Sequence, residues 1–143
     1  MNRADLEYIR QLNDRINGAL LHIEQLKQKA FPGAIRYDDT GASKPMPENK
    51  LESVFCLIDQ EERRVNRLID QYVALKLEAI QLIQSANMEC AARHILYLRY
   101  LSRDPRTGES LEWPDVLRFI SKYHNISERH VYRLHHIALQ KLS

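Results

Sequence analysis

The 143-residue sequence contains only four glycines, five prolines and two cysteines. All five prolines and three of the four glycines fall in or beside two stretches, at about 31–49 and 102–114. The rest is made of long runs rich in Leu, Ile, Glu, Gln, Arg and Lys, which favour helix. We therefore expect an all-α protein.

The sequence also lacks any apolar run long enough to cross a bilayer. Its first residues, Met-Asn-Arg-Ala-Asp-Leu-Glu, have no apolar stretch behind their charges, so we expect no signal peptide. These features predict a soluble, cytoplasmic protein with no membrane association.

Patterns that carry chemistry are scarce as well. Cys56 and Cys90 have no neighbouring cysteine, so we expect both to be buried and reduced. The histidines near the end of the chain include no pair four residues apart, which argues against a zinc site. The sequence has no glycine-rich phosphate loop, nucleophile elbow or catalytic triad order. We expect no metal, no cofactor and no enzymatic activity.

Two apolar stripes dominate the first 87 residues. Leu and Ile recur at threes and fours over about 3–29 and again over about 50–85, which predicts two long helices separated by a flexible linker at about 31–49. The first stripe consists of Leu6, Ile9, Leu12, Ile16, Leu20, Ile23 and Leu26. Such narrow stripes resemble those of coiled coils and must be buried, either as an antiparallel hairpin or against a second copy of the chain. We favour the second copy, so residues 1–87 are interpreted as a homo-oligomerisation stalk.

Residues 88–143 predict a small domain of three helices, at about 88–103, from Trp113 to near His124, and at 128–142. This part carries nine Lys and Arg against six Asp and Glu, a balance of +3, which favours an anionic partner.

The stretch from Ile120 to Leu134 has the pattern of a helix-turn-helix. Asn125 tolerates a left-handed backbone at the turn, and Ser127 is a good N-cap for the following helix. Val131 and Leu134 lie on the inner face of that helix. Its outer face carries Arg129, Arg133 and His136, flanked by His130 and Tyr132. A helix with this division can lie in the DNA major groove.

The C-terminal third resembles the promoter-reading domain of bacterial sigma factors. It is closer still to the sigma-like domain of late-gene transcription activators from phages of Gram-positive bacteria, the RinA and ArpU type. The residues that carry the resemblance are Leu98-Arg-Tyr100, Ile120-Ser121, Asn125-Ile-Ser127 and Val131-Tyr-Arg-Leu-His135, with Ala138-Leu139 and Leu142. It departs from the family in its long loop from Ser102 to Glu112.

The resemblance implies that one set of residues faces the groove: Ser127, Arg129, His130, Tyr132 and Arg133. Arg99, Arg118 and Lys122 are the candidates for sequence-independent phosphate contact. His135, Trp113 and Tyr100 are predicted to be packed residues. The simpler interpretation of Arg129 and Arg133, the solvated face of an amphipathic helix, stays open.

These patterns predict a sequence-specific, duplex-DNA-binding transcriptional regulator that acts as an oligomer. The resemblance implies that it is a phage or prophage activator, working in the cytoplasm of a bacterial host, and that it contacts host RNA polymerase. One alternative is a DNA-packaging protein similar to a terminase small subunit. Another is an interaction protein that binds polymerase but not DNA.

Overall fold

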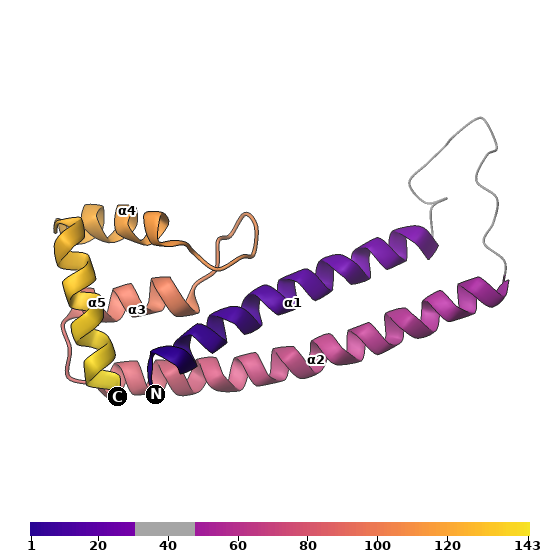
Figure 1. Ribbon diagram of the computed structural model, residues 1–143, viewed down its shortest axis with the longest axis horizontal. Helices are drawn as coiled ribbons and strands as arrows, with labels where there is room; N and C mark the ends of the chain where they lie inside the picture. The colour runs from indigo at the N-terminus through magenta and orange to yellow at the C-terminus, as the bar shows by residue number, and fades with distance from the viewer. Residues whose placement is uncertain (31–47) are drawn as a thin grey trace. The chain divides into compact units, whose positions relative to one another are not determined.

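The computed structural model describes residues 1–30 and 48–143, and the regular structure in these ranges is helical, which confirms the all-α prediction (Figure 1). The predicted linker lies outside the described residues, apart from its last two, which begin α2. Within the described ranges, no helix is both long and apolar enough to span a membrane. The helices are α1 (Arg3–Ala30), α2 (Glu48–Ser85), α3 (Cys90–Leu96), α4 (Trp113–His124) and α5 (Glu128–Leu142).

One predicted helix differs from the structure. Instead of running over 88–103, α3 begins at Cys90 and continues as a π-helical turn over Tyr97–Leu101. A π turn holds more residues than an α turn. Three consecutive residues, Arg99, Tyr100 and Leu101, are therefore buried together in this turn.

Both cysteines are exposed, so the prediction that they are core residues is wrong. Cys56 lies two residues before the buried Ile58, and positions two apart on a helix point to different sides. Cys90 is the first residue of α3, where the chain has only just entered the helix.

The described residues form two compact units, and their boundaries differ from the predicted division at residue 87. One unit combines Met1–Arg15 with Asp70–Ser143, and the other is Ile16–Ile69. Helices α1 and α2 each contribute a segment to both units. The beginning of the chain thus belongs to the same unit as the C-terminal helices.

In the unit Ile16–Ile69, the segments of α1 and α2 lie side by side and bury Ile16, Ile23, Ile58 and Val65 between them. Leu20 was predicted on the same stripe, but it is 48% exposed. At 3.6 residues per turn, Leu20 is rotated by roughly 60° from Ile23 around the helix axis. Leu20 therefore lies at the edge of the contact between α1 and α2.

Two adjacent acids interrupt the apolar stripe of α2 in this unit, and both face α1. Lys27 Nζ lies 3.0 Å from Glu62 Oε1, and His22 Nδ1 lies 3.9 Å from Glu61 Oε2. Polar contacts therefore connect the two helices where the apolar stripe is broken.

The unit formed by Met1–Arg15 and Asp70–Ser143 has one apolar core, to which every helix contributes. α3 contacts both α4 and α5, and α5 crosses the ends of the other two (Figure 1). The largest fully buried side chains in this unit are Leu6, Ile9, Leu12, Ile83, Ile95, Leu96, Ile120, Val116 and Val131.

Polar side chains of α1 hold the loop 102–112, which leads into α4. Arg10 Nη2 donates to the Leu111 carbonyl at 2.9 Å, and Asn13 Nδ2 donates to the Gly108 carbonyl at 3.2 Å. The backbone N–H of Ser110 donates to Asp14 Oδ1 at 3.2 Å. Because the loop ends where α4 begins, these bonds also position α4.

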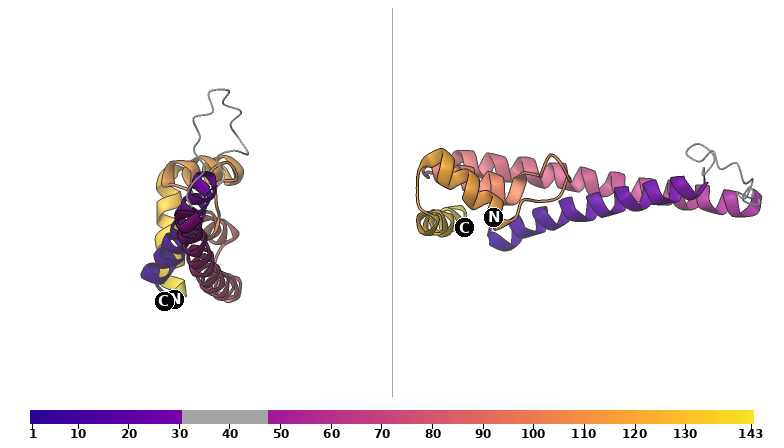
Figure 2. Two further views of the ribbon diagram at one scale, coloured as in Figure 1. Left: turned by 90° about the vertical axis from the view of Figure 1, so that its right-hand side faces the viewer. Right: turned by 90° about the horizontal axis from the view of Figure 1, so that it is seen from above.

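The two ends of the chain meet in the same unit. The Met1 ammonium group donates to the Leu142 carbonyl at 3.3 Å, and both views of Figure 2 show the termini together.

A short turn joins α4 to α5. Asn125 has φ 53° and ψ 50°, the left-handed conformation that the sequence predicted. Ser127 is the N-cap of α5, and its Oγ accepts a hydrogen bond from the His130 N–H at 3.2 Å. Both local predictions for this turn are confirmed.

The left-handed backbone at Asn125 predicts a specific order of stability. Asn125→Gly should match the wild type or exceed it, because glycine has no Cβ to clash in this conformation. Asn125→Val should lose about 1–2 kcal/mol of unfolding free energy, since a β-branched side chain is strained there. Urea unfolding measures both variants. The control is Asn87→Val, an exposed asparagine without a positive φ; equal stability of Asn125→Gly and Asn125→Val would contradict the expectation.

Candidate nucleic-acid interface

The inner face of α5 is fully engaged in the core. Val131, Leu134, His135 and Ala138 are all buried, at the spacing of three and four residues that one side of a helix requires. The predicted inward positions Val131 and Leu134 are confirmed. This packing leaves the opposite side of α5 to solvent.

His135 is a packed residue, as predicted, and it forms a buried hydrogen bond. Its Nε2 lies 2.8 Å from the Tyr100 hydroxyl oxygen, and the Trp113 ring approaches it edge-on at 4.7 Å between centroids. Burial, with smaller contributions from the charges of Arg3 and Arg99, lowers the pKa of His135 from its ordinary 6.5 to about 4. The imidazole is therefore neutral in the folded protein at neutral pH.

Arg99 does not belong to the accessible surface. Its side chain is only 9% exposed, and Nη2 and Nη1 lie 3.9 and 3.7 Å from carboxylate oxygens of Glu7 and Glu112. Its guanidinium group also lies over the half-buried Trp113 ring, 4.9 Å from the centroid. The group is buried and already paired, which argues against the predicted phosphate contact of Arg99.

The outer face of α5 carries the remaining predicted residues. Arg129 and Arg133 are exposed and four residues apart, so their side chains share one face. In the described part of the chain, neither arginine forms an ion pair. Ser127, Tyr132 and His136 are exposed too, while His130 is half-buried.

Smaller contacts position the polar side chains of this face. The Tyr132 ring rests against Trp113, 5.2 Å between centroids, and the His136 ring lies 3.3 Å from the Gln140 amide nitrogen. The Ser127 cap accepts the N–H of His130, and the N–H groups of Glu128 and Arg129 in the same turn have no acceptor within the helix. These free donors are suited to an anion at the beginning of α5.

Arg118 and Lys122 are both exposed and lie four residues apart on α4. They form a second basic pair, on the helix that precedes the turn. The structure leaves both side chains accessible, in contrast to Arg99.

An aromatic cluster near these residues was not predicted. Phe119 and Tyr123 are exposed and stack at 5.8 Å, and His94 of α3 meets both rings edge-on. His94 Nδ1 lies 3.1 Å from His124 Nε2, and burial followed by the charge of His124 lowers the pKa of His94. The sequence signal for this cluster was the four-residue spacing of Phe119 and Tyr123, which places both rings on one side of α4, away from its buried positions.

Among residues 1–30 and 48–143, no group of three His, Cys, Asp or Glu side chains is arranged to hold a metal ion. Comparison with known protein families, curated proteins and solved structures finds no match for this chain. A functional assignment therefore depends on the geometry of the chain's own residues.

The low pKa of His135 predicts acid sensitivity. The unfolded chain binds a proton near pH 6.5, whereas the folded protein binds it only near pH 4. The contribution of His135 to stability is therefore complete above pH 6.5 and decreases as the pH falls towards 4. His135→Gln keeps an acceptor for Tyr100 and should lose less stability than the wild type over this interval.

Chemical unfolding measured between pH 7 and 4 tests this difference. His136→Gln changes the exposed neighbour, whose charge is the smallest of the contributions to the low pKa of His135, and as the matched control it should follow the wild type closely. Parallel pH profiles for the wild type and His135→Gln would show that His135 does not carry the effect.

Proposed function

We propose that the protein is a sequence-specific, duplex-DNA-binding transcriptional regulator in which α4, the turn at Asn125 and α5 act as a helix-turn-helix. One observation carries the proposal: α5 buries one face completely and presents two unpaired arginines, Arg129 and Arg133, on the other. An arginine with no carboxylate partner keeps its full donor capacity for an incoming ligand.

The chemistry of these side chains matches a base edge in the major groove. Arginine donates two parallel hydrogen bonds to guanine O6 and N7, and each such pair contributes about 1–3 kcal/mol of base discrimination. Tyr132, His130 and His136 add hydrogen-bonding groups along the same helix. In this proposal, Arg129 and Arg133 read bases and the other three side chains adjust the fit.

Phosphate contacts would fix the orientation of α5 on the duplex. Arg118 and Lys122 on α4 are exposed cations, and the Ser127 end of α5 offers free backbone N–H groups. Contacts of this kind are independent of sequence and weaken as salt rises.

The regulator acts as a homo-oligomer through its N-terminal helices. Among the described residues of the unit Ile16–Ile69, the exposed large apolar side chains include the neighbours Leu20 and Leu21 on α1, which a second copy would cover. Joining two DNA-binding modules raises the effective concentration of the second at its half-site. An oligomer that binds repeated half-sites, together with the resemblance to phage late-gene activators, favours activation of a phage promoter in the host cytoplasm, with contact to RNA polymerase.

Selection of binding sites from a randomised duplex pool at near-physiological salt tests DNA reading. The wild type should enrich repeated half-sites, and Arg129→Ala/Arg133→Ala should reduce affinity for them about tenfold or more. Arg63→Ala/Arg67→Ala is the matched control, because it removes two arginines at the same spacing from α2.

Two results would contradict DNA reading by α5. One is the absence of any enriched sequence. The other is enrichment that survives the loss of Arg129 and Arg133. Binding to RNA polymerase without DNA enrichment would instead support a polymerase-interaction protein.

Sedimentation equilibrium tests the oligomer. The expected mass is a small multiple of the 16.9 kDa chain. Leu20→Lys/Leu21→Lys should shift the protein to monomer, since it places charges on the apolar contact. Gln25→Lys/Gln28→Lys adds the same charge to exposed positions of α1 and should not. A monomer at every concentration would contradict the oligomer, and a ring of many copies would favour the DNA-packaging function.

A further inference from the structure

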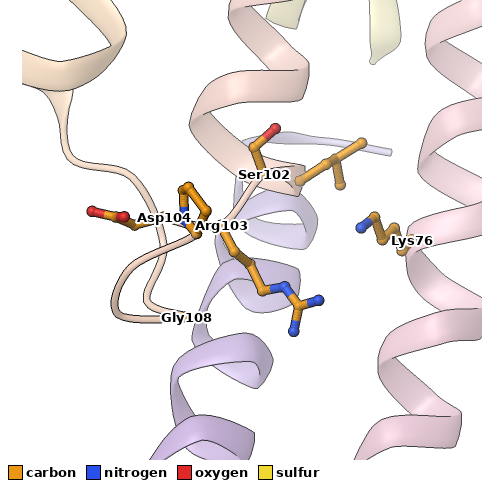
Figure 3. Close-up of a pocket in the computed structure, with 7 residues that line it drawn as sticks. Lys76, Ser102, Arg103, Asp104 and Gly108 are labelled. Atoms are coloured by element: carbon orange, nitrogen blue, oxygen red, sulfur yellow. The ribbon is translucent and has the colours of Figure 1, made fainter.

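A pocket lies between α2 and the loop that follows the π-helical turn. It has a volume of about 560 Å³, within the range of small-ligand sites (Figure 3). All its residues belong to the unit formed by Met1–Arg15 and Asp70–Ser143. The lining residues are Lys76, Leu101, Ser102, Arg103, Asp104, Pro105 and Gly108.

Two cations extend into this pocket from opposite sides. Lys76 projects from α2 and Arg103 from the loop, and Figure 3 shows their charged groups directed toward the same space. In the part of the chain that the structure describes, neither group forms an ion pair. Burial, followed by the charge of Arg103, lowers the pKa of Lys76. The two positive charges therefore repel each other across an open space.

The one carboxylate of the pocket does not neutralise them. Asp104 Oδ1 accepts a hydrogen bond from the backbone N–H of Arg106 at 2.8 Å, within its own loop. Figure 3 shows the Asp104 side chain directed away from Lys76. An incoming anion would meet the two cations without competition from this group.

The loop that carries Arg103 is held in place before any ligand arrives. The Asp104 N–H donates to the Glu109 carbonyl at 2.7 Å, and the Gly108 N–H donates to the Asp104 carbonyl at 2.8 Å. An isolated β-bridge joins Arg103 to Ser110, which is itself bonded to α1. Such preorganisation reduces the ordering cost of binding.

We infer that this pocket binds a phosphate group between Lys76 and Arg103. Arginine offers paired donors to two phosphate oxygens, and lysine supplies a compact charge. A doubly charged phosphate neutralises both cations, whereas a single carboxylate would leave one positive charge uncompensated. The phosphate belongs to a small ligand or to a nucleic-acid backbone, and these sources share the same recognition chemistry.

The position of the pocket bears on the source of the phosphate. Within this unit, α5 lies at one end of α3 and the loop 102–112 at the other (Figure 1). A small phosphorylated ligand in the pocket would leave the outer face of α5 free. The site thus provides a place for an effector, separate from Arg129 and Arg133.

Calorimetric titration of the whole protein with inorganic pyrophosphate, at constant ionic strength, tests the inference. Lys76→Gln and Arg103→Gln should each weaken binding about tenfold, as expected for the loss of one charge-assisted contact. Arg106→Gln removes an exposed charge from the same loop and should change affinity less than about twofold. Lys76→Arg should retain binding, and thermal unfolding would verify that each variant is folded.

A second titration with duplex DNA distinguishes the sources. Loss of pyrophosphate binding alone assigns the pocket to a small ligand, and loss of DNA binding alone assigns it to a backbone phosphate. Equal behaviour of Lys76→Gln, Arg103→Gln and Arg106→Gln toward both probes would overturn the site. Because pyrophosphate binding is measured without DNA, its result is independent of the role proposed for Arg129 and Arg133.

Discussion

The hydrogen bonds between α1 and the loop 102–112 are the constraint on which the other features of the unit formed by Met1–Arg15 and Asp70–Ser143 depend. Asn13 is only 5% exposed, so its bonds to Gly108 and Ser110 replace water that cannot reach it. A buried polar group left without its partner costs about 1–3 kcal/mol. The loop in turn carries Arg103 at the pocket and leads into α4. Both the outer face of α5 and the cationic pocket therefore depend on side chains at the beginning of the chain.

The helices and the turn were predictable because their determinants are local. Periodic Leu and Ile predicted α1 and α2 within two residues, and Asn125 and Ser127 predicted the turn through their own backbone chemistry. The division of α5 into inner and outer faces likewise followed from the spacing of Val131 and Leu134. In each case, the residues that decide the structure are within four positions of one another.

Features that depend on distant partners could not be read in this way. Arg99 looked like a free cation, but its partners include Glu7, and their ion pair exists only in the folded unit. Lys76 and Arg103 have no pattern that connects them, although they line one pocket. The exposure of Cys56 and Leu20 also follows from which helix faces meet. Periodicity identifies an apolar side, but the partner helix determines how wide the buried area is.

The discontinuous composition of the larger unit has a consequence for biosynthesis. Arg10 and the Leu111 carbonyl that it binds are 101 residues apart in the chain. Because translation runs from the N- to the C-terminus, Leu6, Ile9 and Leu12 are made long before the other buried residues of this unit in α3, α4 and α5. The entropic cost of closing a loop rises only slowly with its length, so the long separation costs little stability. Until the later helices are made, however, the apolar stripe of α1 is exposed to chaperones and to aggregation. Helix α1 is synthesised before α2 to α5 and is thus among the last to reach its final environment.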